Sequence, residues 1–134
     1  MALDRISGPI RLQMMDDGVN WILLETVTYR DLAGRVWSAY AGMITDLTSI
    51  PRALWSTVGS PATGLYRLAS VFHDAAYRQP GMVQEDADNM LYELSVYCGC
   101  DEALAAIIRE GVRLGGGWAF QEDQQAIREG KIVV

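Results

Sequence analysis

The chain has 134 residues, of which 50% are hydrophobic and 21% are charged, a composition typical of a compact globular protein. Its formal net charge of -6 argues against nucleic acid as a partner, because such binding depends on clustered Lys and Arg. The sequence has no apolar run long enough to span a bilayer, and its N-terminus lacks the apolar core of a secretory signal. We therefore expect one domain over residues 1–134, made in a cytoplasm.

Residues 1–45 carry the signals of strands. Apolar and polar residues alternate over 10–14, and the Asp-Gly pair at 17–18 is typical of a tight hairpin. Residues 20–29 and 35–43 are rich in aromatic, β-branched and other apolar residues, and a turn signal at 31–34 separates them. These patterns predict a three-stranded antiparallel meander.

Residues 46–134 have a mainly helical pattern. Ser60 followed by Pro61 is a helix start signal, and the apolar period predicts a helix over 62–78 that stops before Pro80. Further helices are predicted over about 84–97, from Asp101 to the glycines at 115–117, and, shorter, over about 120–129, with 131–134 as a candidate last strand. Strands first and helices after define an α+β fold.

The two cysteines, Cys98 and Cys100, are separated by one residue. A disulfide at this spacing would close a small strained ring, and a zinc site would need more ligands than the nearby sequence supplies. We expect reduced, partly buried thiols.

His73 is the only histidine, so it is the only side chain with an ordinary pKa near neutrality and the natural candidate for a general base. On a helix Tyr77 shares its face, whereas Asp74 is turned by about 100° toward the face of Arg78. A helix that folds back against this one would bring Asp88 opposite His73. A buried carboxylate there would fix the imidazole tautomer and stabilise its protonated form.

A structural interpretation of the same residues stays open. A lone histidine on a helix is more often packed than catalytic, and Asp74 would pair with Arg78 at the i,i+4 spacing. Asp86 and Asp88, close to a helix start, would then serve only to complement the helix dipole. A single histidine also excludes the phosphohydrolases that use several histidines to hold metals.

The segment over residues 45–52 is a second candidate site, because polar side chains follow the end of a predicted strand there. Its candidates are Asp46, Ser49 and Arg52. Asp46, Thr48 or Ser49 would alternatively cap a turn that Pro51 begins. Ser49 as a nucleophile activated by His73 lacks the Gly-x-Ser-x-Gly elbow that usually surrounds such a serine.

Several motifs occur together in a fixed order: TDLTSIPR over 45–52, HDAAY over 73–77, Ala87-Asp88, and a glycine-rich stretch before Trp118. In this order they resemble a family of small tailed-bacteriophage and prophage proteins catalogued as domain of unknown function 1353. The resemblance implies a phage origin and brings no settled activity.

The pattern His-Asp-x-x-Tyr with a later Asp also looks like the active-site helices of the phospholipase A2 superfamily, including the domain in parvovirus capsids. That resemblance implies that His73 activates water, Asp74 binds calcium and Asp88 orients His73, with Tyr77 supporting Asp88. Calcium also needs backbone oxygens from an upstream loop, for which residues 58–64 are the only candidate and do not reproduce the family's loop closely. The disulfides of the secreted members are missing here, as they are from the viral ones.

Two functions follow as expectations. One is a phage hydrolase of the phospholipase A2 type, with calcium as cofactor, that acts on lipid of the host envelope. The other is a non-catalytic virion or assembly component of a tail, neck or capsid, which contacts other virion proteins or forms a homo-oligomer. Either protein would be made in the host cytoplasm, and the virion is its expected later location.

Overall fold

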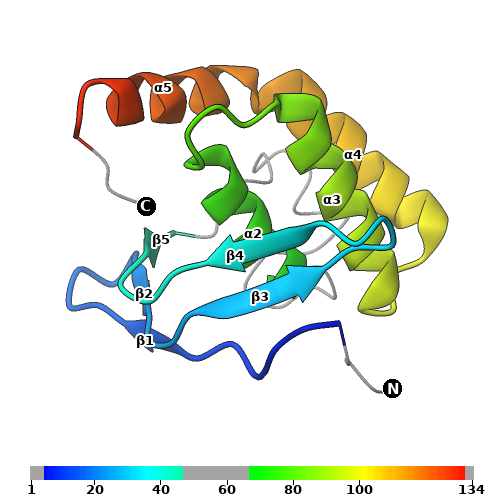
Figure 1. Cartoon of the computed structure of the whole chain (residues 1–134), viewed down its shortest axis with the longest axis horizontal. Helices are drawn as coiled ribbons and strands as arrows, with labels where there is room; N and C mark the ends of the chain where they lie inside the picture. The colour runs from blue at the N-terminus through cyan, green and yellow to red at the C-terminus, as the bar shows by residue number, and fades with distance from the viewer. Residues whose placement is uncertain (1–4, 47–66, 132–134) are drawn as a thin grey trace.

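The computed structural model describes residues 5–46 and 67–131. These residues form short antiparallel strands followed by helices, which lie against one side of the strands (Figure 1). The predicted α+β fold, with strands first and helices after, is confirmed. The strands are β1 (Leu12–Met14), β2 (Trp21–Leu23), β3 (Val27–Arg30), β4 (Val36–Ala39) and β5 (Ile44–Thr45), and the helices are α2 (Arg67–Tyr77), α3 (Gln84–Tyr97), α4 (Glu102–Gly115) and α5 (Gly117–Arg128).

The turn between β1 and β2 forms at the predicted Asp-Gly pair. The Asp17 carboxylate accepts hydrogen bonds of 2.9 Å from the backbone N–H groups of Val19 and Asn20. These bonds, that from Asn20 first, hold the pKa of Asp17 below its ordinary value. Gly18 adopts a φ of 72°, in the left-handed region that favours glycine. Local chemistry therefore accounts for this hairpin.

The predicted meander differs from the observed strands in one respect, because its second and third strands are both interrupted. The outer parts, β2 and β5, join β1 in a sheet of order β1-β2-β5, whereas the inner parts, β3 and β4, form a separate two-stranded sheet. The pairs Arg30↔Val36 and Ile22↔Ile44 nevertheless keep the register of one continuous hairpin. The meander is present, but it is divided between two sheets.

The interruption has a local cause. The Thr26 hydroxyl accepts a 2.9 Å hydrogen bond from the backbone N–H of Ala41, which takes that donor out of the strand ladder. Gly42 follows with a φ of 92°, so the returning strand turns sharply before β5. A side-chain hydrogen bond and one glycine thus bend both strands at the same level.

The helices largely follow the predicted bounds. The predicted bounds of α3 are confirmed, and α4 begins after Asp101, whose carboxylate accepts a 2.8 Å bond from the N–H of Ala103. The predicted helix start at Ser60-Pro61 lies outside the described residues, as does most of the candidate last strand over 131–134.

The last helix is longer than predicted. Gly116 has φ -94° and ψ -9°, near the right-handed helical region, and it ends α4 and begins α5 at once. The glycine run therefore makes a one-residue corner where a loop was expected, and α5 starts at Gly117 instead of near residue 120.

Both cysteines are free thiols, as predicted. Burial raises the pKa of Cys98 to about 11 and also raises that of Cys100. Both are therefore weak nucleophiles at neutral pH.

Helix α2 lies at the centre of the fold, where it packs against α3, β4 and α5. Buried side chains of the strands and the helices form one apolar cluster around it. In the described part of the chain, none of the helices is both long and apolar enough to cross a membrane. The central position of α2 explains why its polar side chains at 70 and 73 are fully buried.

Candidate functional site

The site begins at the turn that folds α3 back against α2. The backbone N–H of Met82 bonds to the carbonyl of Gln79 at 3.1 Å, and Gly81 has a φ of 73°. Gln124 of α5, which is buried, holds this turn: its Nε2 donates to the carbonyls of Tyr77 and Gln79 at 2.8 and 2.7 Å, and its Oε1 accepts from the N–H of Gly81 at 3.2 Å. One side chain thus satisfies three backbone groups where α2 ends.

His73, Tyr77 and Asp88 meet between α2 and α3. The distance from His73 Nε2 to Asp88 Oδ1 is 2.7 Å, and the Tyr77 hydroxyl donates to the same oxygen at 2.7 Å. Their exposed fractions are 0%, 3% and 2% for His73, Tyr77 and Asp88. The predicted placement of Asp88 opposite His73 is therefore observed, and we call these three residues the His73 cluster.

The hydrogen bonds of the cluster define a single tautomer of the imidazole. A carboxylate oxygen accepts and cannot donate, so the His73 nitrogen that faces Asp88 carries the hydrogen. The other nitrogen, Nδ1, is buried and has no hydrogen-bond partner within the described residues. In the neutral form of the ring this nitrogen carries the lone pair that can accept a proton.

Tyr77 stays a hydrogen-bond donor over the physiological pH range. Burial of its ring, together with the nearby charge of Asp88, raises the pKa of its hydroxyl above the ordinary value of 10.0. Its ring lies 4.2 Å from that of His73 between centroids and packs edge-on against Phe120 of α5 at 5.1 Å. Tyr77 therefore fixes both the Asp88 carboxylate and the position of the imidazole.

The corner between α4 and α5 packs directly against the cluster. A Cβ atom on Gly116 would lie 2.9 Å from the Tyr77 hydroxyl and 2.5 Å from the carbonyl oxygen of Val112, so only glycine fits there without movement. Gly117 lies against the amide of Gln84, whose Nε2 is 3.5 Å from the second carboxylate oxygen of Asp88. The glycine run thus has a packing role beyond ending a helix.

Asp74 lies on the neighbouring face of α2, as predicted, and does not join the His73 cluster. Its Oδ2 pairs with Arg78 Nη2 at 3.3 Å, and Arg78 also donates through Nη1 to the carbonyl of Ile44 in β5. The alternative interpretation of Asp74, an i,i+4 partner of Arg78, is therefore observed. This ion pair is partly buried and ties α2 to the β1-β2-β5 sheet.

Two further carboxylates surround this ion pair. Burial raises the pKa of Asp123 in α5, Arg78 lowers it, and the charges of Asp74 and Asp46 add to the increase. Asp46 is exposed and follows directly after β5. The other two candidates of that segment, Ser49 and Arg52, lie outside the described residues.

A calcium site does not follow from the described residues alone. They contain no group of three or more His, Cys, Asp or Glu side chains arranged to hold a metal ion. Asp74 is the one carboxylate that the resemblance assigns to calcium, and it is already paired with a guanidinium. Calcium takes six to eight oxygen ligands. The candidate loop over 58–64 lies outside the described residues, so the calcium prediction stays a prediction.

Sequence reasoning missed two residues that shape the site. Gln124 lies in a polar stretch of α5, and no local pattern distinguishes it from its exposed neighbour Gln125. Gly116 was visible only as part of a helix-ending run. Its role depends on contact with Tyr77, 39 positions away by residue number, and such a contact leaves no local signal.

The fold and site define an α+β protein in which a helix pair holds a buried His–Asp–Tyr cluster. The family described as "Protein of unknown function (DUF1353)" matches residues 21–112, which include β2 to β5 and most of the cluster's supporting helices. The chain belongs to this family. No curated protein and no solved structure matches it significantly.

Proposed function

We propose that the chain is a phage-encoded hydrolase in which His73 is the general base, Asp88 orients its ring and Tyr77 holds Asp88. The observation that carries this proposal is the division of the two imidazole nitrogens. Nε2 is bonded to Asp88, whereas Nδ1 has no partner among the described residues. A base that is oriented through one nitrogen and reacts through the other requires this division.

The proposed reaction is hydrolysis of an ester. Nδ1 of His73 takes a proton from water, and the water oxygen attacks the ester carbonyl carbon. The ester C–O bond then breaks, the imidazolium returns its proton to the leaving alcohol, and an acid and an alcohol are released. Asp88 stabilises the imidazolium while it carries the proton. The resemblance to phospholipase A2 makes phospholipid of the host envelope the proposed substrate.

Fatty acid release from phospholipid vesicles tests this proposal. Wild-type protein is incubated with vesicles of phosphatidylethanolamine and phosphatidylglycerol, once with calcium and once with a chelator. We expect release by the wild type and a decrease of at least about 100-fold in His73→Gln, because a general base contributes a factor of that order. Arg113→Ala, which changes an exposed ion pair, is the matched control. No release by the wild type in either condition would contradict the lipid substrate.

The calcium arm tests the role expected for Asp74. If calcium is the cofactor, release requires it and is lost in the chelator and in Asp74→Asn. If release persists in the chelator, calcium has no part in the reaction and Asp74 serves as the ion-pair partner of Arg78.

The alternative function is a non-catalytic virion or assembly component, and the complete burial of His73 favours it. In that case the cluster joins α2 to α3 and has no substrate. This alternative predicts that His73→Gln lowers phage yield only as far as it destabilises the protein. A phage complementation assay beside a thermal unfolding measurement distinguishes the two functions: a stable His73→Gln protein that fails to support phage growth contradicts the alternative.

A further inference from the structure

The β3-β4 sheet has one edge that is covered and one that is open within the described part of the chain. Residues 5–7 cover the edge of β3: the backbone N–H of Ser7 donates to the carbonyl of Thr28 at 2.9 Å, and that of Arg30 donates to the carbonyl of Arg5 at 3.0 Å. The backbone groups of Thr28 and Arg30 therefore point away from β4.

The antiparallel pairing then fixes the direction of the backbone groups in β4. Thr28 lies opposite Ser38, and Arg30 lies opposite Val36. In a non-hydrogen-bonded antiparallel pair, the N–H and C=O groups of each residue point away from the partner strand, toward opposite edges of the sheet. The N–H and C=O groups of Val36 and Ser38 therefore point away from β3, and they form no hydrogen bond with another described residue.

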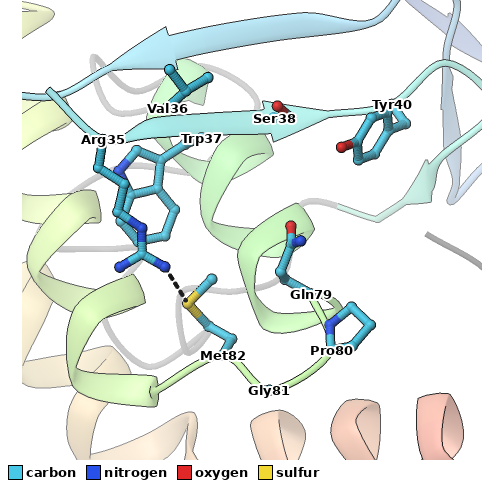
Figure 2. A pocket seen from close by; sticks show the side chains of 9 residues that line it. All are labelled: Arg35, Val36, Trp37, Ser38, Tyr40, Gln79, Pro80, Gly81 and Met82. Carbon is cyan, nitrogen blue, oxygen red and sulfur yellow. Dashed lines mark hydrogen bonds between the residues drawn. The ribbon is translucent and has the colours of Figure 1, made fainter.

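A groove of about 310 Å³ lies along this open edge. Figure 2 shows β4 on one side and the α2–α3 turn on the other, with the Gln79 side chain between them and Tyr40 near one end. This volume is at the lower end of the range of about 300–1,000 Å³ that is usual for ligand sites. The lining residues are Arg35, Val36, Trp37, Ser38, Tyr40, Gln79, Pro80, Gly81 and Met82.

At one end of the groove the charge of Arg35 is balanced by Asp86. The Arg35 guanidinium lies 4.2 Å from the centre of the Trp37 ring and 3.7 Å from the sulfur of Met82 (Figure 2). It also lies 3.3 Å from Asp86 Oδ2. Its charge is offset by Asp86, so the groove requires no charged ligand. What remains available is a row of main-chain donors and acceptors at the spacing of a strand.

The shape of the groove restricts what can pair with β4. The α2–α3 turn forms its opposite wall, so the edge of a whole sheet, such as β4 of a second copy, would collide with residues 79–82. A single extended strand would have to displace only the Gln79 side chain, which lies between the two walls (Figure 2), and Gly81 adds no side chain to the wall. We propose that the groove binds an extended peptide segment of another protein, which adds a strand to β4 through hydrogen bonds with Val36 and Ser38. This proposal does not depend on the hydrolase proposal.

Peptides selected for binding test the site. Random heptapeptides displayed on a carrier are selected on the full chain, and the selected peptides are synthesised. Their dissociation constants are then measured for wild type, Ser38→Ala and Ser38→Pro by fluorescence polarisation. Ser38→Ala keeps the backbone N–H and should bind like wild type. Ser38→Pro removes that N–H at an edge position where proline is tolerated and should weaken binding about tenfold or more.

Two further measurements keep the test decisive if Ser38→Pro fails to fold. Gln79→Trp fills the groove from its other wall and should also abolish peptide binding. Hydrogen exchange of the Val36 and Ser38 amides, followed by NMR, should slow when peptide is added. The proposal is overturned if no peptide is selected, if Gln79→Trp binds as the wild type does, or if these two amides exchange equally fast with and without peptide.

Discussion

Helix α2 and Arg78, the residue directly after it, carry two polar pairs with the same four-residue spacing, and the two pairs have different surroundings. His73 and Tyr77 point into the protein and share the carboxylate of Asp88 on another helix. Asp74 and Arg78 lie one position further along, remain partly exposed, and pair with each other. The spacing alone does not distinguish these two pairs.

The difference lies in how much water each pair has lost. A buried hydrogen-bonded carboxylate is costly to leave unpaired, whereas an ion pair that keeps some contact with water contributes little net stability. The comparison therefore predicts that equivalent substitutions in the two pairs change the free energy of unfolding by very different amounts.

The largest expected effect is that of Asp88→Ala. It leaves His73 Nε2 and the Tyr77 hydroxyl buried without a partner, so we expect a loss of about 3–5 kcal/mol in the free energy of unfolding. Asp74→Ala is the matched substitution on the other face, with an expected loss of about 1 kcal/mol or less. Equilibrium unfolding in urea measures both values. Equal losses in the two variants would contradict the expectation that burial makes the Asp88 contacts more important for stability than the Asp74 ion pair.

Gln124→Leu is expected to lower the free energy of unfolding by about 2–3 kcal/mol. It removes the side chain that bonds to the carbonyls of Tyr77 and Gln79 and to the N–H of Gly81. Gln125→Leu is the control, because Gln125 is exposed and bonds only to Glu129 among the described side chains. Urea unfolding measures both variants, and a loss below about 0.5 kcal/mol for Gln124→Leu would mean that water replaces its hydrogen bonds.

Gly116→Ala tests the corner that packs on the buried face. The new methyl group would overlap the carbonyl oxygen of Val112 and press on the Tyr77 hydroxyl, so we expect a loss of about 2 kcal/mol. Gly117→Ala is the control, since its nearest new contact is an ordinary 3.6 Å to Gln84 and alanine favours a helix. Thermal unfolding measures both variants. Equal melting temperatures for Gly116→Ala and Gly117→Ala would contradict the close contact at position 116.

The smallest expected effect concerns Asp123, on the partly exposed face. Because burial raises its pKa above the ordinary value of 3.8, the folded state binds its proton more tightly than the unfolded state, and ionisation lowers stability. Asp123→Asn should therefore raise the melting temperature slightly at pH 7, and this advantage should disappear as the pH falls through the raised pKa toward 3.8. Melting curves of both proteins from pH 3 to pH 8 check this. A melting-temperature difference in favour of Asp123→Asn that grew as the pH fell would contradict the prediction.

Local patterns predicted much of the candidate site. The sole histidine, the four-residue spacing to Tyr77 and the short turn before the next helix were enough to place Asp88 opposite His73. The same spacing predicted the Asp74–Arg78 pair as an alternative. The support from α5 was not predicted, because Gln124 and Gly116 act through contacts with residues of α2 that are distant in the sequence.

The strands show the same division. Turn chemistry at Asp17-Gly18 and the apolar runs predicted the antiparallel hairpins, and the structure supplies their register. The break of the long hairpin into two sheets was decided by Thr26, whose hydroxyl bonds to Ala41 across the hairpin. A side-chain bond between two strands depends on their pairing and has no signal of its own in the sequence.

The sequence by itself predicted the class of fold, the bounds of α3 and the placement of Asp88 opposite His73, because each follows from short-range periodicity and turn signals. Only the tertiary structure decided which of the polar pairs on α2 is buried, which nitrogen of His73 is free, and which edge of β4 is open. These features depend on what packs against each element, and packing joins residues that the sequence keeps far apart.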